Sequence, residues 1–453
     1  MKIKAGRLAA ALATGVGIAL VSPPWEIQAQ AWVLLAIFIS TILAVLLDAI
    51  PILPAALAGL AVSVLSGTLT PAQAYSGFSK GFILLILVAF VIAKGMIRSG
   101  LGARIATVLI SRFGTSTLRL GYCIAATDMI IAPAFPSNTA RSGILFPIAH
   151  ALSIDTGSRA HDGTRLRTGR FLMFVSFASL KISSAFWLTA MAANPAGVAI
   201  ARDLGVEIDF GTWLLAASVP GLVAIVVLPL VLMRLCPPEL KQTPEAPAIA
   251  QARLKELGPM SRDERVMLGI FLVLMAGWAS SGALGLDPAA IAFAGLAVLL
   301  LSGVYPLKAI KDECGDALET FLWFAILYTL STYLNEFGFM SILGEKLSAP
   351  LTGLSWPVVY VLLTALYIVI HYFFVSQTAQ LLALYGVFLT LSLRAGIPPY
   401  LAAFTYLFAT NYFAALTPQA SSANVIFVGS GYIEPQEVYR YGGLMTLVAF
   451  AVY

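Results

Sequence analysis

The sequence predicts an all-α polytopic membrane protein that contains two repeats of opposite orientation. Of its 453 residues, 59% are hydrophobic and 11% are charged, whereas a soluble domain usually has about a quarter of its residues charged. The apolar residues form long uninterrupted runs, which include residues 31–47, 83–93, 214–233 and 266–278. Polar motifs of the first half also recur in the second half at nearly constant spacing.

The apolar runs have the length and pattern of membrane-spanning helices. A helix needs roughly 20 apolar residues to cross the hydrocarbon core, and the runs predict about 11 spanning helices plus two re-entrant hairpins. A membrane β-barrel would alternate apolar and polar residues, and these runs do not.

The basic charge balance follows from the predicted topology. The net charge is +5, and with the N-terminus inside, most Lys and Arg residues fall on the cytoplasmic side, as the positive-inside rule requires. No nucleic-acid partner is needed to explain the charge. We therefore expect a multi-pass protein of a bacterial inner (plasma) membrane, with a cytoplasmic N-terminus.

Composition divides the chain into four parts. Residues 1–30 are predicted to form an N-terminal span and loop, although a basic start followed by apolar residues 8–21 also fits a cleaved signal peptide. The other parts are a first repeat over 31–235 with a hairpin at 118–152, a proline-rich cytoplasmic linker over 236–264, and a second repeat over 265–453 with a hairpin at 358–393.

Two further expectations concern the chain end and the thiols. Residues 443–453 are too few to cross a bilayer, so we expect either a truncated chain or a last helix that a partner completes. Cys123, Cys236 and Cys314 are too scattered for a metal or redox motif and are expected to be free thiols.

Three pairs of motifs define the internal repeat. The pairs are Gly100 and Gly338, Ser137 and Ser376, and Asn194 and Asn424, with spacings of 238 (338 minus 100), 239 (376 minus 137) and 230 (424 minus 194). The predicted topology places the two copies in opposite orientations. Inverted repeats of this kind place a substrate site at their interface near the membrane midplane, so the pattern predicts a secondary transporter and not an enzyme.

Small polar side chains at the hairpin tips and in two later segments are the candidate substrate ligands. Ser, Asn and Thr cap helix N-termini, whose free N–H groups attract carboxylates. Two such tips that meet would form a neutral cradle for a dianion. The alternative is that these residues only cap broken helices or mediate helix packing. The candidates are Ser137, Asn138, Thr139, Ser376, Gln377, Thr378, Thr189, Asn194, Thr417 and Asn424.

Charged groups at membrane depth are functional candidates by default. Arg141 lies one turn after the first tip and would contribute positive charge to an anion site or replace a coupling cation. The alternative is an ion pair with Asp128. Protonated His371 would mirror Arg141 in the second repeat, unless it is a packed core histidine. Lys181 and Asp48 are expected to be partly buried structural ions.

These motifs resemble the divalent anion/sodium symporter superfamily over nearly the whole chain from about residue 31. The family has a Ser-Asn-Thr at each hairpin tip and an unwound helix with a Thr-Pro-Pro-Asn-like element in each repeat. The matching segments here are 137–139, 376–378, 189–194 and 417–424, and Val428-Gly-Ser-Gly-Tyr-Ile433 resembles the end of the family's last element.

The segment Pro136-Ser-Asn-Thr-Ala-Arg141 resembles the branch of citrate/succinate and 2-oxoglutarate/malate exchangers. The resemblance implies an elevator with scaffold and transport domains, usually as a homodimer in the lipid bilayer. It also implies that Asn138, Thr139, Gln377 and Thr378 hold the carboxylates of a small anion.

Two departures from the family pattern bear on ion coupling. Sodium-coupled members carry a small hydroxyl residue four positions before each Ser, where this chain has Pro133 and Tyr372, and Gln377 replaces Asn. We therefore expect sodium-independent exchange of di- or tricarboxylates of the succinate, malate, 2-oxoglutarate and citrate class, with no cofactor and no bound metal.

A sodium-coupled dicarboxylate symporter is the main alternative, sulfate stays open as a substrate, and an arsenite or sodium/proton antiporter is a third transport reading. A membrane hydrolase lacks a nucleophile, base and acid constellation, and a structural assembly protein has no use for charges at depth.

Overall fold

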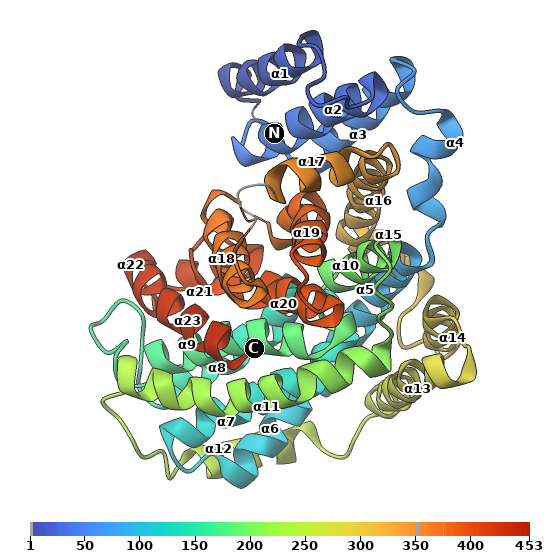
Figure 1. Cartoon of the computed structure of the whole chain (residues 1–453). Coiled ribbons are helices and arrows are strands. Elements are labelled where there is room, and N and C mark those ends of the chain that lie inside the picture. The colour runs from blue at the N-terminus through green and yellow to red at the C-terminus, as the bar shows by residue number, and fades with distance from the viewer. Residues whose placement is uncertain (1–2, 349–350, 352, 375) are drawn as a thin grey trace. The chain divides into compact units, whose positions relative to one another are not determined.

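The computed structural model describes residues 3–348, 351, 353–374 and 376–453, so Lys2 of the basic N-terminus lies outside the described residues. Every regular element among these residues is helical (Figure 1), and Ser116 and Gln242 form an isolated antiparallel bridge. The elements of the first half are α1 (Ala5–Leu20), α2 (Ala29–Leu46), α3 (Ile52–Leu65), α4 (Pro71–Ala74), η1 (Ser76–Ser79), α5 (Gly81–Ser99), α6 (Leu101–Phe113), α7 (Thr117–Ile131), η2 (Ala132–Ala134), α8 (Asn138–Asp155), α9 (Gly169–Phe186), η3 (Leu188–Ala190), α10 (Ala193–Asp203), α11 (Phe210–Leu235) and α12 (Ala246–Leu257).

The second half of the chain is helical as well. Its elements are α13 (Arg262–Leu284), α14 (Pro288–Leu301), α15 (Leu307–Glu313), α16 (Gly315–Glu336), α17 (Phe339–Ser348), α18 (Trp356–Ile370), η5 (His371–Phe373), α19 (Gln377–Arg394), α20 (Pro399–Tyr412), η6 (Phe413–Ala415), α21 (Ser422–Gly429), α22 (Pro435–Glu437), η7 (Val438–Gly442) and α23 (Gly443–Val452). The all-helical class is therefore confirmed.

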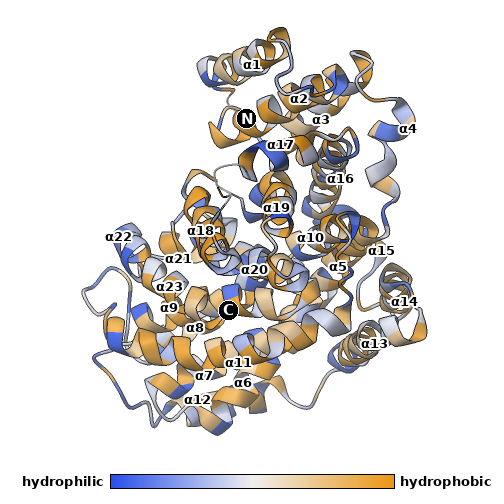
Figure 2. Ribbon diagram, viewed as in Figure 1, coloured by the Kyte–Doolittle hydropathy of each residue, from blue (hydrophilic) through white to orange (hydrophobic). Residues whose placement is uncertain are grey.

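Six helical segments among the described residues are long and apolar enough to cross a membrane. They are Ala29–Leu46, Gly81–Ser99, Phe210–Leu235, Arg262–Leu284, Gly315–Glu336 and Trp356–Phe373, and shorter apolar helices cover Ala5–Leu20, Ile52–Leu65 and Pro288–Leu301. The apolar character of α11, α13 and α14 is visible in Figure 2. Several large apolar side chains of α11 are exposed, as a lipid-facing helix requires.

The chain forms two compact units. The first comprises residues 1–87, 196–208 and 315–407. In this unit α1, α2 and α3 pack in sequence, α16 packs on α2 and α3, and α17 and α18 pack on α19. Gly59 allows α3 to approach α2 closely, because a Cβ there would lie 2.5 Å from Oγ1 of Thr41.

The second unit comprises residues 88–195, 209–314 and 408–453, and α9 lies at its centre. Every residue from Phe171 to Phe186 is buried, and α7, α8 and α11 all pack against this helix. A helix that is buried on all sides is normally apolar all round. The polar side chains of α9 must therefore find partners inside the unit.

The predicted linker, residues 236–264, is folded onto the second unit. The backbone N–H of Thr243 donates to the carbonyl of Thr115 at 3.0 Å, and that of Thr117 donates to the carbonyl of Lys241 at 3.1 Å. Helix α12 then packs along α6. The segment is thus hydrogen-bonded to the start of α7. Its cytoplasmic location stays a prediction.

The predictions for the cysteines are confirmed, whereas the prediction for Asp48 is wrong. The three cysteines are free and buried. Gly100 and Gly338 both have φ of 77° immediately before the amphipathic helices α6 and α17, a conformation that favours glycine. Asp48, in contrast, was expected to be partly buried, but its side chain is 79% exposed and pairs with Lys4 at the surface.

Candidate functional site

The first hairpin breaks at the predicted tip. Helix α7 ends at Ile131, a 3₁₀ turn follows, and α8 begins at Asn138. Pro133 and Pro136 cannot donate backbone hydrogen bonds, which explains why the helix stops here. Ser137 caps α8 by accepting a hydrogen bond from the N–H of Ala140 at 3.3 Å.

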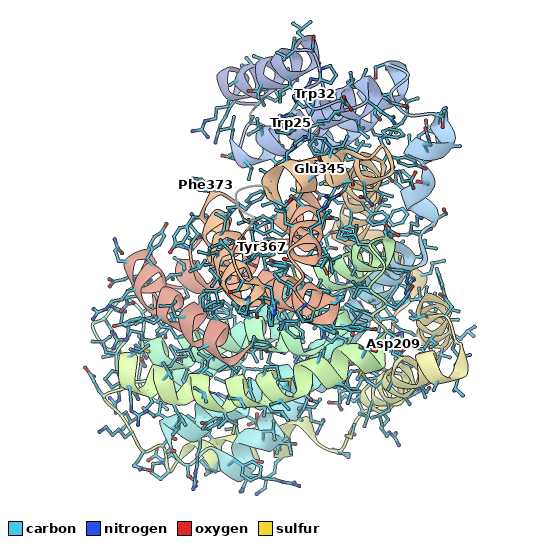
Figure 3. The ribbon with its side chains drawn as sticks, in the orientation of Figure 1. Trp25, Trp32, Asp209, Glu345, Tyr367 and Phe373 are labelled. Atoms are coloured by element: carbon cyan, nitrogen blue, oxygen red, sulfur yellow. The ribbon has the colours of Figure 1, made fainter. Side chains whose placement is uncertain are left out.

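The second hairpin has the same local geometry. Ser376 has φ and ψ of −147° and 123°, against −144° and 124° for Ser137. Its side chain also accepts from the N–H three residues later, that of Ala379, at 3.3 Å. On the preceding arm, Tyr367 is buried and Phe373 is exposed (Figure 3). The helix break and its cap therefore recur in both halves of the chain.

The side chain of Asn138 is held in one orientation at the first tip. Its Oδ1 accepts a hydrogen bond from Arg141 Nη2 at 2.5 Å and another from Ser184 Oγ at 2.5 Å. The amide is planar, so Nδ2 is directed away from these two donors. The amide N–H₂ group of Asn138 is a type of hydrogen-bond donor suited to a carboxylate.

Arg141 forms the ion pair with Asp128 that was the alternative to a free charge at the anion site. Their Nη1 and Oδ1 atoms are 3.7 Å apart and both side chains are fully buried. Arg141 Nη1 donates to Ser183 Oγ at 2.8 Å, and Ser183 in turn donates to Asp128 Oδ2 at 2.6 Å. The charge of Arg141 is therefore matched within the hairpin, and the guanidinium acts on the tip by positioning Asn138.

The first unwound segment lies against the first tip. Thr189 Oγ1 donates to the carbonyl of Pro133 at 2.9 Å. Asn194 Nδ2 donates to the carbonyls of Ser184, at 2.8 Å, and Trp187, at 3.2 Å, which cap the end of α9. Both candidates are buried and tie the broken helix to the hairpin.

The second unwound segment repeats this cap. Asn424 Nδ2 donates to the carbonyls of Ala414, at 2.7 Å, and Thr417, at 2.9 Å. These acceptors lie ten and seven residues before the Asn, as they do for Asn194. In this register Thr417 corresponds to Trp187, and its buried Oγ1 has no hydrogen-bond partner among the described residues.

The second unit brings the first tip and the second unwound segment together. Thr139 Oγ1 and Ser422 Oγ are 2.6 Å apart, and both side chains are exposed. Thr139, which follows Asn138 in the first repeat, is thus in hydrogen-bond contact with Ser422 of the second repeat. This grouping joins residues that are far apart in the chain.

The candidates of the second tip lie in the first unit. Gln377 and Thr378 are buried at the start of α19. His371 is also buried, and its Nδ1 is 2.6 Å from Oε1 of Gln380. Since Gln380 Nε2 donates to the carbonyl of Tyr367 at 2.8 Å, the Gln oxygen is the acceptor and His371 carries its proton on Nδ1. That the two tips meet stays a prediction.

Sequence reasoning missed several residues of this group. Ser183 and Ser184 orient Arg141 and Asn138 from α9, and Lys181 reaches Asn424 with Nζ 2.7 Å from Oδ1. Lys181 is 2% exposed, so it is fully buried and not the partly buried ion that the sequence suggested. The spacing of 230 residues, extended back from Asn424, would have paired Lys181 with Asn411.

Comparison with known proteins places this multi-pass membrane protein among transporters and not among enzymes. The family model described as "Sodium:sulfate symporter transmembrane region" matches residues 2–453, so the chain belongs to that divalent anion:sodium symporter family. The resemblance seen in the tip motifs is therefore confirmed.

The chain is similar to proteins named as transporters. YflS of Bacillus subtilis (strain 168), provisionally named a malate transporter, is 41% identical over 444 residues, which cover 98% of this chain and 93% of YflS. The L-tartrate/succinate antiporter of Escherichia coli O6:K15:H31 is 31% identical over 464 residues, covering 98% of this chain and 95% of the antiporter. Among solved structures, the YdaH transporter of Alcanivorax borkumensis matches with a TM-score of 0.60 at 16% identity, over 87% of each chain, which shows the fold alone.

Proposed function

We propose that the protein is a secondary transporter that exchanges di- or tricarboxylates across the inner membrane, with its N-terminus in the cytoplasm. The observation that carries this proposal is the recurrence of one capped helix break at Ser137 and Ser376. Helix N-termini and amide N–H groups bind carboxylates, and each hydrogen bond to a charged group contributes roughly 1.5–3 kcal/mol. The tartrate/succinate antiport named for one relative supports an exchanger.

The repeat also supports an alternating-access mechanism. In both unwound segments, an Asn donates to carbonyls ten and seven residues earlier in the chain. In both hairpins, a Ser at the tip caps the second arm. Repeats of inverted orientation let one site open to either side by exchange of their conformations. We infer an elevator movement of the hairpins and unwound segments in a homodimer.

The proposed exchange does not require sodium. The positions four residues before the two tip Ser residues are Pro133 and Tyr372, neither of which offers the small hydroxyl ligand of sodium-coupled relatives. His371, when protonated, supplies positive charge next to the second tip, whereas Arg141 at the first tip is paired with Asp128 and positions Asn138. A sodium-coupled dicarboxylate symporter is the second candidate, favoured only by the family's description.

Proteoliposomes containing the full chain test the proposal. Uptake of labelled succinate, 2-oxoglutarate and citrate is measured into vesicles that are empty or preloaded with unlabelled dicarboxylate, each with and without sodium, and with excess sulfate as a competitor. We expect uptake only into preloaded vesicles, unchanged by sodium. Sodium-driven uptake into empty vesicles would establish the symporter instead. Inhibition of carboxylate uptake by excess sulfate would show that the site also binds an inorganic dianion.

A further inference from the structure

Two crossed hydrogen bonds connect the unwound segments of the two repeats. Lys181 Nζ donates to Asn424 Oδ1 at 2.7 Å, and Asn411 Nδ2 donates to Asn194 Oδ1 at 2.8 Å. The donors are 230 residues apart (411 minus 181), and so are the acceptors (424 minus 194). Lys181 and Asn411 are therefore counterparts, and each braces the Asn that belongs to the other repeat.

Either a lysine or an asparagine meets the structural need at these positions. In Asn194 and Asn424, the amide N–H₂ group donates to two preceding backbone carbonyls. This orientation turns the amide oxygen of each residue towards the donor from the other repeat. A neutral amide satisfies that oxygen at Asn194, and an ammonium satisfies it at Asn424. Charge, and not hydrogen bonding, is what the chain gains by having Lys181.

Lys181 forms no ion pair of its own among the described residues, and it shares the electrostatic attraction of Asp128 with Arg141. Its ammonium has one hydrogen bond, to Asn424, and lies 4.9 Å from the ring centroid of Phe177. Asp128, the acidic group of this region, is already paired with Arg141. A buried ammonium that is not paired is strongly unfavourable, so an anionic partner is expected.

The same turn contains a second polar group that is unsatisfied. Thr417 accepts the Asn424 amide on its carbonyl, while its own Oγ1 is fully buried and has no hydrogen-bond partner among the described residues. Buried hydroxyls without a partner are rare and need an explanation. An anion that occupies this turn would accept hydrogen bonds from both the hydroxyl and the ammonium.

We propose that Lys181 selects the charge of the transported anion, with one substrate carboxylate neutralising its ammonium beside Asn424 and Thr417. This inference rests on the proposed function and names the residue that makes a second negative charge necessary. It also gives a physical reason for exchange, because the carrier without substrate keeps an unpaired buried cation. Asn411 makes the matching position of the other repeat neutral, so the two ends of the substrate meet different charges.

Three variants of the full chain in proteoliposomes test this role. Lys181→Asn installs the counterpart residue, and Lys181→Gln keeps a longer amide in case the first variant does not fold. Lys94→Gln, in helix α5, is the control at another lysine. Preloaded exchange of labelled succinate is measured against increasing succinate or monomethyl succinate. The ratio of uptake into empty and preloaded vesicles is recorded for each protein.

We expect the Lys181 variants to lose about tenfold or more in apparent succinate affinity while their affinity for monomethyl succinate changes little. We also expect a higher share of uptake into empty vesicles. Adding Asn411→Lys to Lys181→Asn should restore part of the preference for the dianion, since the charge returns on the other repeat. A merely structural role would lower the affinities for both anions equally.

The outcomes separate this inference from the proposed function. If the folded variants keep the wild-type ratio of succinate to monomethyl succinate affinity, or lose both affinities equally, the role of Lys181 is refuted while dicarboxylate exchange stands. If the wild-type protein exchanges no carboxylate, the proposed function itself is wrong.

Discussion

Arg141 and Gln380 occupy the same position in the two hairpins. Each lies four residues after a capping Ser, and each reaches across to the preceding arm: Arg141 Nη1 is 3.7 Å from Asp128 Oδ1, and Gln380 Nε2 is 2.8 Å from the carbonyl of Tyr367. Asp128 and Tyr367 are themselves 239 residues apart (367 minus 128). The contact between arms is therefore common to both hairpins, and the first adds a buried ion pair to it.

That ion pair predicts a specific stability defect. Asp128→Asn leaves the Arg141 guanidinium as an uncompensated buried charge, so we expect a loss of about 3–5 kcal/mol in the free energy of unfolding. Adding Arg141→Gln copies the second hairpin and should recover much of the loss. Denaturant titration of the detergent-solubilised protein measures the free energy of unfolding of the single and the double variant. A single variant as stable as the wild type would contradict the pairing.

The orientation of Asn138 predicts a binding defect without unfolding. Asn138→Ala removes the amide N–H₂ that faces away from Arg141 and Ser184, and we expect carboxylate binding to be abolished. Thr378→Ala, at the second tip, should have the same effect. Isothermal titration of the purified protein with succinate measures the loss.

Ser218→Ala is the matched control for these tip variants, because its Oγ donates to the carbonyl of Leu215 in its own helix and to no other described residue. It should bind succinate as the wild type does. If both Asn138→Ala and Thr378→Ala bind normally, the assignment of the tips as the binding site is wrong.

Two adjacent glycines near the C-terminus predict opposite outcomes. A Cβ at Gly442 would lie 1.9 Å from the carbonyl oxygen of Ala415, whereas a Cβ at Gly443 would meet nothing within 4 Å. Gly442→Ala should therefore prevent correct folding of the second unit. Gly443→Ala, in a helix, should be neutral or stabilise by about 0.5–1 kcal/mol. Fluorescence-detected size exclusion compares the two, and equal profiles would contradict the close approach.

A cluster at α22 predicts a pH-dependent contribution to stability. Burial raises the pKa of Glu437, but hydrogen bonds from the Glu434 backbone and from Arg165 outweigh it, so the pKa lies below its usual 4.5. A lowered carboxyl pKa stabilises the fold above the unfolded-state pKa, and this stability is lost as the pH falls through the folded-state value.

Glu437→Gln should therefore lower the unfolding temperature at pH 7, and the difference from the wild type should shrink below about pH 4.5. Thermal unfolding from about pH 3 to about pH 8 measures this. Glu207→Gln, at a surface pair with Arg202 in which both side chains are more than half exposed, is the control and should show little difference. A constant difference at all pH values would argue against the ionised Glu437 as the cause.

Local sequence patterns predicted the class of fold and the places where helices break. Uninterrupted apolar runs and the scarcity of charge require helices in a bilayer. Pro133 and Pro136 stop one helix and Ser137 caps the next, so the break before Asn138 was predictable from residue types. The second tip has no proline, and the break before Gln377 was predicted from the repeat of the Ser-capped motif. The positive φ of Gly100 and Gly338 also follows from residue type, since glycine tolerates that conformation.

Only the tertiary structure decided the partners of the buried polar groups. The sequence left Arg141 with two roles, and packing of the hairpin arms gave it Asp128 as a partner. Nothing in the sequence singled out Lys181 as a functional residue, because the role of a charge in an apolar stretch depends on the groups that surround it. Residue types determine local backbone geometry over a few positions, whereas the environment of a buried charge depends on helices that meet across hundreds of residues, as Lys181 and Asn424 do here.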